Sequence, residues 1–189
     1  NDFDQVFVML ASGGNPLQLT SDSVSKTVDG FSPDGTRIYY DIANGGQIHS
    51  IPTLGGNDTT IASGAALATS PDGNSYYFIQ GNFDRAVTRR PVVGTGVDKV
   101  FETPQGLTPT RVLPYPDGQN LLVVAGNDII QGSTTIHFFR VNVATHSSQA
   151  IGDLNGSPTG LVWDEPGESI DCSRTVNGVT NIWNYRLSD

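Results

Sequence analysis

The chain has 189 residues and carries a formal net charge of −9 at pH 7. An acidic surface repels phosphate backbones, so this charge argues against nucleic-acid binding by bulk electrostatics, and no apolar run is long enough for membrane insertion. The length suits one domain with a hydrophobic core, and the 22 glycines, together with frequent turn residues, favour an all-β chain.

A tight turn that leads into an apolar strand recurs along the chain. In its first copy, Pro33 fixes φ at the second turn position, Asp34 can bond the local backbone, and Gly35 can adopt a positive φ. The closing glycines of the three clear copies and of a fourth, degraded copy are Gly35, Gly73, Gly118 and Gly167. They stand 38, 45 and 49 residues apart. Such spacings are typical of repeat architectures, which include propellers with four-stranded blades.

A second marker repeats in phase with the turn. Each turn and its strand are followed by another strand and then by a turn rich in small residues, as in Gln47 to Ile51 before Gly55-Gly56. The doublet Gly13-Gly14 precedes Gly55-Gly56 by 42 residues. The strands expected at 76–79 and 121–124 are apolar on both faces, which indicates burial between neighbouring blades.

Together these motifs resemble the TolB-like, WD-type propeller repeat of bacterial proteins. The resemblance rests on Phe31 to Gly35, Ile48, Gly55-Gly56 and Gln18-Leu19-Thr20, and it extends over nearly the whole chain. It implies a β-propeller with four-stranded antiparallel blades. The family includes envelope proteins, sensor regions of regulators and non-catalytic domains of peptidases, so the resemblance specifies fold better than function.

We predict a single domain over residues 1–189 with seventeen strands. Complete blades are expected at residues 24–63, 64–105 and 106–152. Residues 1–23 supply the third and fourth strands of a partial blade, and residues 153–189 supply the first three strands of another. Since four blades need sixteen strands and five need twenty, the chain holds about four to five blades and does not divide into whole ones.

Two arrangements of the ends are open. In the first, Leu17 to Thr20 pairs with the last blade and closes the ring internally. In the second, the chain is an open arc or part of a larger, incomplete ring. An open arc leaves Phe7, Met9, Trp183 and Tyr185 on uncovered faces. We then expect self-association through the terminal blades, with more than roughly 1,000 Å² buried in total.

The sequence carries no recognised motif for a metal, a cofactor or a catalytic centre. His49 and His137 occupy equivalent positions of third strands, where a packing role is expected, and His146 lies in a turn. Cys172 lies in a strand, where a small, buried apolar side chain is expected. We therefore predict no catalytic residue, no metal and no cofactor.

Hydrolase chemistry finds little support among the residues. There is no Gly-x-Ser-x-Gly elbow and no helical pattern to carry one. A glycosidase needs two carboxylates that face each other across the substrate, whereas Asp164, Glu165 and Glu168 are close neighbours on or beside one turn. The aspartates of the repeated turns are assigned to turn formation.

Binding residues are expected on the variable loops at one rim. The loops between second and third strands share a rim and differ from blade to blade, whereas the repeated turns at the other rim are uniform. The candidates on these loops are Asn44, Asn82, Arg85, Asn127, Asp128 and Asn177. The longest loop, residues 126–132, contains two isoleucines, which either pack on a neighbouring blade or belong to a partner surface.

The preferred function is a non-catalytic propeller scaffold that binds a protein or peptide, as the sensor or interaction region of a larger bacterial protein. The alternative is an enzyme that acts on a carbohydrate or another small molecule in the central channel. A deep channel pocket with two facing carboxylates or a bound metal favours the enzyme, and a shallow, mostly neutral channel favours the binder. The resemblance alone implies an extracytoplasmic location, in the periplasm or cell envelope.

Overall fold

The computed structural model describes residues 3–42, 46–81, 85–127, 135–156 and 158–187. Within these ranges every regular element is a β-strand, and strands hold more than half of the chain. Since no helix occurs in the described ranges, none has the length and hydropathy of a membrane-spanning helix. The prediction of an all-β chain built from antiparallel meanders is confirmed.

The described residues form sixteen strands in four hydrogen-bonded sheets. The first sheet pairs β1 (Phe7–Val8) with β2 (Leu17–Gln18). The second, seven-stranded sheet contains β3 (Lys26–Phe31), β4 (Arg37–Ile42), β5 (Gln47–Pro52), β6 (Thr59–Thr69), β7 (Ser75–Gln80), β8 (Ala86–Pro91) and β9 (Asp98–Glu102). The third contains β10 (Leu107–Pro114), β11 (Asn120–Asn127), β12 (Thr135–Asn142) and β13 (Ser148–Asn155). The last contains β14 (Thr159–Trp163), β15 (Ser169–Val176) and β16 (Val179–Arg186).

The long strand β6 belongs to two meanders at once. Its first half pairs with β5 through residues 59–63, and its second half pairs with β7 through residues 64–69. The described chain therefore has one strand fewer than the seventeen predicted, because two expected strands are continuous. Gly64 lies at the change of partner, where a Cβ atom would collide with the carbonyl oxygen of Ile79.

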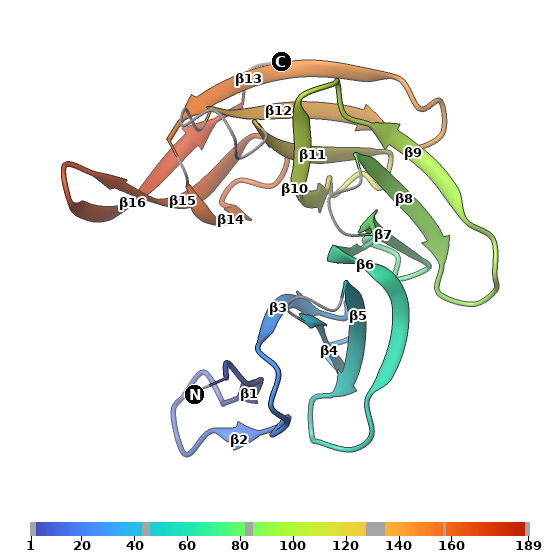
Figure 1. Ribbon diagram of the computed structural model, residues 1–189, viewed down its shortest axis with the longest axis vertical. Helices are drawn as coiled ribbons and strands as arrows, with labels where there is room; N and C mark the ends of the chain where they lie inside the picture. Colours follow the sequence, from blue (N-terminus) through green and yellow to red (C-terminus); the bar gives the residue numbers. More distant parts are fainter. Residues whose placement is uncertain (1–2, 43–45, 82–84, 128–134, 157, 188–189) are drawn as a thin grey trace.

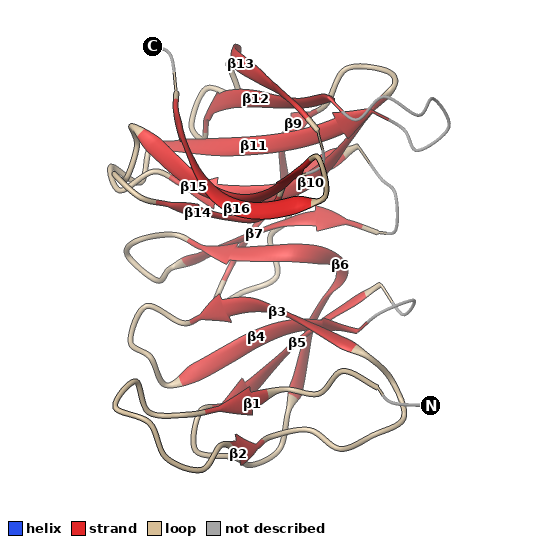
Figure 2. Cartoon of the chain, turned by 90° about the vertical axis from the view of Figure 1, so that its left-hand side faces the viewer, coloured by secondary structure: helices blue, strands red, loops and turns tan. Residues whose placement is uncertain are grey.

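The sheets follow one another around an open arc (Figure 1). Figure 2 shows β1 and β2 at one end of the stack of sheets and β10 to β16 toward the other end. Among the described strands, β16 is an edge of its sheet and pairs with neither β1 nor β2. The predicted incomplete ring is confirmed, and internal closure through residues 17–20 is not found in the described part of the chain.

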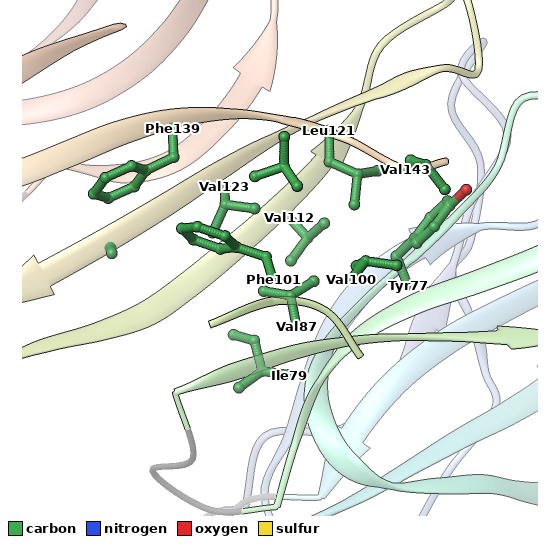
Figure 3. Packing of buried hydrophobic residues seen from close by; sticks show 12 residues of the cluster. Tyr77, Ile79, Val87, Val100, Phe101, Val112, Leu121, Val123, Phe139 and Val143 are labelled. Atoms are coloured by element: carbon green, nitrogen blue, oxygen red, sulfur yellow. The ribbon is translucent and has the colours of Figure 1, made fainter. Parts of the chain in front are cut away.

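Apolar side chains packed between successive sheets form the core. The largest cluster lies between the strands β7 to β9 and the sheet β10 to β13, and it includes Tyr77, Val87 and Val123 (Figure 3). From the other face of β11, Leu122 and Val124 join the cluster that packs against β14 to β16. Residues 121–125 are all 0% exposed. This confirms the prediction that a second strand is buried on both faces.

The repeated turns fold as their residues predict. The Ser32 hydroxyl and the Thr36 backbone N–H donate to Asp34 Oδ1 at 2.6 and 3.1 Å. The Gly35 N–H donates to the carbonyl of Ser32 at 2.8 Å, and Gly35 has a φ of +69°. These hydrogen bonds, that of Ser32 foremost, hold the pKa of Asp34 below its usual range. The second turn repeats the arrangement with its own serine and aspartate.

We expect Gly64→Ala to lower the free energy of unfolding by about 1–3 kcal/mol, because the new Cβ must displace the Ile79 carbonyl from its place beside β6. Gly30→Ala is the matched control, since Gly30 has the same φ of +156° and no heavy atom lies within 4 Å of a Cβ built there. Urea unfolding of both variants measures the difference. Equal losses would show that backbone conformation alone, and not the contact with Ile79, requires the glycine.

Candidate functional site

The concave side of the arc is formed by β3, the second half of β6, β10 and β14, which are the first strands of four successive meanders (Figure 1). A pocket of about 200 Å³ lies among them and is here called the channel pocket. Its lining includes the charged residues Asp29 and Arg111 and the apolar residues Leu67, Leu113 and Leu161. Blades of a propeller surround a central channel, so this pocket lies on the channel face.

Each of the four inner strands is interrupted by a β-bulge. The register shifts fall at Asp29 in β3, at residues 66–67 in β6, at Thr110 in β10 and at residues 160–161 in β14. Ala66 has a φ of +55°, which is uncommon for a residue with a side chain. A bulge redirects a side chain and frees backbone N–H groups from the ladder. The bulges therefore determine which side chains line the channel pocket and which N–H groups need another acceptor.

Two carboxyl groups meet beside the channel pocket. The side chains of Asp29 and Asp41 are hydrogen-bonded to each other. Asp41 Oδ2 accepts the backbone N–H of Ala66 at 2.9 Å, and Asp29 accepts the backbone N–H of Leu67. The carboxyl pair thus satisfies the N–H groups that the β6 bulge frees. Asp29 lines the channel pocket, whereas Asp41 is not part of its lining.

The carboxyl pair holds a proton. Burial, followed by the charge of Asp41, raises the pKa of Asp29 to about 8. Burial also raises the pKa of Asp41, and the N–H of Ala66 opposes that rise. Asp29 Oδ2 and Asp41 Oδ1 are buried and have no donor among the described residues, as expected where a proton is retained on the pair. Like charges in contact resist joint ionisation, and the pair therefore keeps one proton near neutral pH.

Arg111 is the cation of the channel pocket. Its side chain is partly buried, and it makes no hydrogen bond or ion pair with any residue that the structure describes. It acts on Asp29 and Asp41 through space and lowers their pKa values, but burial outweighs its effect on both. A guanidinium carries five N–H donors in a rigid fork. Arg111 lines the pocket, and these donors have no hydrogen-bond partner among the described residues.

The histidines make hydrogen bonds in addition to packing contacts. His49 is buried and stacks on Tyr40 with ring centroids 5.4 Å apart, and its Nδ1 lies 2.8 Å from Asp58 Oδ2. The Tyr40 hydroxyl donates to the same oxygen at 2.8 Å. His137 Nδ1 lies 2.6 Å from Asp153 Oδ1. The described residues contain no group of three or more His, Cys, Asp or Glu side chains placed to hold a metal ion.

The residues predicted to bind on the variable loops stay apart from the channel pocket where they are described. Three of them lie outside the described residues: Asn44, Asn82 and Asp128. Arg85 forms an ion pair with Glu102 at 2.9 Å. Asn127 Oδ1 lies 3.2 Å from His137 Nε2, and Asn177 has a φ of +52° in the β15–β16 hairpin. Arg85 precedes β8, Asn127 ends β11 and Asn177 lies in the β15–β16 turn, so the three adjoin different sheets. A binding role for this rim stays a prediction.

The carboxylates of the degraded turn hold local structure. Asp164 accepts hydrogen bonds from the Ser169 hydroxyl at 3.2 Å and from the Asn184 side chain at 2.8 Å. Glu168 pairs with Arg186 at 3.0 Å. These contacts join the turn to the β15–β16 hairpin, so the three neighbouring acids act in the architecture of the last sheet.

Sequence reasoning missed Asp29, Asp41 and Arg111. A signal was present, because charged residues are unusual in strands that are packed between neighbours. The pairing of β3 with β4 brings the two aspartates together, since Asp41 lies opposite Thr27 and close to the bulge at Asp29. Arg111 reaches the same pocket from another sheet. That meeting depends on the curvature of the arc, which the repeat period does not specify.

Comparison with solved structures identifies the architecture. TolB from Acinetobacter baumannii matches with a TM-score of 0.70 and 18% sequence identity, over 97% of this chain and 46% of that chain. The chain has the fold of a TolB-like β-propeller. A TolB candidate from Agrobacterium tumefaciens matches with a TM-score of 0.64 and 16% identity, over 91% of this chain and 62% of that chain.

The TolB-like fold is shared with an enzyme. An oligogalacturonate lyase in complex with manganese matches with a TM-score of 0.63 and 14% identity, over 96% of this chain and 57% of that chain. At such identities the likeness shows the fold alone. The chain spans about half the length of these structures. The sequence matches no protein-family model and no curated protein.

We expect the free energy of unfolding to fall as the pH rises from about 4 to about 8, and Asp29→Asn to remove much of that fall. The pKa of Asp29 is raised in the folded chain, so the unfolded chain releases this proton at a lower pH than the folded chain does. The associated stability is full below the ordinary aspartate pKa and is lost as the pH rises through about 8. Urea unfolding across this pH range measures it.

Asp4→Asn is the matched control, because it removes an exposed carboxyl and should leave the pH dependence of the wild type in place. If Asp29→Asn shows the same loss of stability toward pH 8 as the wild type, the proton does not reside on the carboxyl pair.

Proposed function

We propose that the chain is a non-catalytic propeller scaffold that binds a protein or peptide partner, with the channel pocket as a contact site. The supporting observation is the pocket itself, in which Asp29 and Arg111 are set among apolar walls on the concave side of the arc. Ligand sites are commonly concave and apolar with a few polar groups. A volume of about 200 Å³ suits one side chain or one chain end.

The geometry of the carboxyl pair favours binding over glycoside hydrolysis. The two carboxyls of a glycosidase stand about 5–5.5 Å apart in retaining enzymes and about 6.5–9.5 Å apart in inverting ones, because the reacting groups lie between them. Asp29 and Asp41 are instead in direct hydrogen-bond contact, and both accept N–H groups of the β6 bulge. Only Asp29 reaches the channel pocket. The pair supports the bulge and does not flank a substrate bond.

An enzyme that acts on a carbohydrate in the channel is the second candidate. It is favoured by the fold shared with an oligogalacturonate lyase over 96% of this chain. The cationic Arg111 would also suit an acidic sugar. The small pocket and the contacting carboxyls weigh against it.

The broader setting is also part of the proposal. The fold likeness to TolB from two bacteria supports a role as the sensor or interaction region of a larger bacterial protein. It likewise supports an extracytoplasmic location, in the periplasm or cell envelope. Both statements rest on fold resemblance.

We expect a peptide library displayed on phage to yield sequences that bind the purified chain with dissociation constants on the order of micromolar. Ala68→Trp should abolish that binding, because Ala68 lines the channel pocket and the indole would fill it. Ala150→Trp is the matched control on the outer strand β13, where Ala150 is exposed. Calorimetry of selected peptides measures the affinities.

Equal binding to both variants would contradict a contact site in the channel. A selection that enriches no peptide, together with cleavage of oligogalacturonate by the purified chain, would replace the scaffold proposal with the enzyme.

We also propose that the β1–β2 sheet is covered by a second copy of the chain. Phe7, Met9 and Leu10 are 53%, 56% and 74% exposed on this sheet and the turn after it. Val6 faces the other way and is buried against β4 and β5. Neighbouring apolar side chains with this exposure form a patch that monomers seldom leave in water.

At the other end of the arc, Trp183 is 42% exposed and Tyr185 is partly buried. Trp183 and Tyr185 lie opposite Cys172 and Ile170, on the face that packs toward β10 to β13. The Tyr185 ring packs at a tilt against Phe138, with 5.2 Å between centroids. The opposite face of this sheet carries the polar residues Asp171, Ser173, Thr180 and Asn184 and the exposed apolar side chain of Ile182. We assign the contact between copies to the β1–β2 sheet, where three exposed apolar side chains follow one another closely in the chain.

Light scattering at micromolar concentration should give a mass near twice 20.1 kDa for the wild type. Met9→Ser should shift the population to monomer, whereas Ile182→Ser, at an exposed apolar position on β16, should leave the dimer intact. A wild-type mass near 20.1 kDa would discard the second copy as the cover of this sheet.

A further inference from the structure

The guanidinium of Arg111 has no ion-pair partner among the described residues. A guanidinium that is partly withdrawn from water normally regains its lost hydration through carboxylate or carbonyl oxygens. Arg111 makes no such hydrogen bond or ion pair within the described residues, although it lines the channel pocket. Its donors are therefore available to an acceptor that enters the pocket.

A role as a fixed counter-ion of the carboxyl pair does not account for Arg111. A contacting arginine would favour the ionised form and hold the carboxyl pKa values low. Asp29 and Asp41 instead have raised pKa values, and the influence of Arg111 on them acts only through space. The two carboxyls are hydrogen-bonded to each other and to backbone N–H groups of β6.

The charged groups around the pocket are compatible with a bound anion. From β3 and β4 the titratable groups are Asp29, Asp41 behind it, and Tyr39, whose pKa is raised by burial. From β10 the group is Arg111. The lining residues of β6 and β14 carry no charge. With Asp29 protonated, the charge nearest the pocket is that of the guanidinium.

We propose that the channel pocket binds a carboxylate group, which pairs with two N–H groups of Arg111 between the apolar walls of the pocket. The fork of a guanidinium matches the two oxygens of a carboxylate and forms short, charge-assisted hydrogen bonds. Apolar walls, among them Leu113 and Leu161, exclude water and strengthen such bonds. The pocket volume of about 200 Å³ accommodates a carboxylate with a small substituent.

The source of the carboxylate rests on the proposed function. In a peptide partner it is a free chain end or an acidic side chain, and in the second candidate it is the carboxylate of a uronic sugar. The three sources share the same chemistry at Arg111. A separate test of the site is therefore possible without knowledge of the partner.

The direct probe is N-acetylalanine, compared with its uncharged amide. Titration of each into the full chain is followed through the NMR signal of the Arg111 Nε–H and gives the affinity. The acid should shift this signal and bind at least about tenfold more tightly than the amide. Affinity should also fall about tenfold as the pH rises from 6.5 to 9, because ionised Asp29 repels the anion.

Variants separate the site from general effects on folding. Arg111→Gln should abolish binding of the acid, and its thermal midpoint should match that of the wild type, because the side chain has no described partner to lose. Arg111→Lys keeps the charge but loses the fork, so partial binding is expected. An acid that binds no better than its amide, or that binds Arg111→Gln as well as the wild type, overturns the carboxylate site.

Two further titrations identify the molecule that supplies the carboxylate and separate this proposal from the scaffold proposal. Peptides selected on the chain are compared with free and amidated C-termini, and galacturonate is titrated in the same way. If peptides bind equally in both forms and bind Arg111→Gln unchanged, the scaffold proposal stands and the carboxylate site is wrong. If N-acetylalanine binds at Arg111 while no peptide is selected, the carboxylate site stands and the peptide function is wrong.

Discussion

The burial of strands between neighbouring sheets is the constraint on which the rest of the structure depends. β11 has residues 121–125 fully buried because one face packs on β7 to β9 and the other on β14 to β16. No single sheet of four strands can bury both of its faces, so each blade requires its neighbours. The arc, and with it the concave channel face, follows from this stacking.

The channel pocket exists because of the same stacking. Its lining comes from strands of successive blades, and Asp29 and Arg111 meet there only when the sheets are placed side by side. The bulges of the inner strands add the local detail. At β6 they leave two N–H groups that the carboxyl pair accepts, which places a proton-holding group beside the pocket. Architecture and electrostatics of the site are thus set by long-range packing together with local backbone irregularity.

Much of the fold can be predicted from the sequence, because the turns and buried strands are specified by residues that are close together in the chain. The Pro-Asp-Gly turns need particular φ angles and side-chain acceptors, and Gly35 and Asp34 supply both in the positions expected. Apolar runs at 76–79 and 121–124 predict burial on both faces, which the structure confirms. The count of strands differs by one because β6 continues through Gly64 from one meander into the next. No turn residues separate its two halves, so the sequence does not show whether they form one strand or two.

The site could not be predicted in the same way. Loop variability predicts a binding rim, and the three described residues of that rim adjoin different sheets and lie apart from the channel pocket. Asp41 and Arg111 stand 70 residues apart in the sequence, and no repeat position marks either of them. They matter to the site because the carboxyls are buried and retain a proton, and because the guanidinium has no described partner. None of these properties belongs to a residue type or to a spacing, since each arises only in the folded arc.

Amide hydrogen exchange in the native chain tests most directly whether packing between sheets holds the arc together. Protection reports the free energy of local opening. The account predicts the slowest exchange in β11, buried on both faces, with protection falling toward β1–β2 at one end and β16 at the other. Equal protection in all the sheets, or greater protection in β16 than in β11, would contradict it.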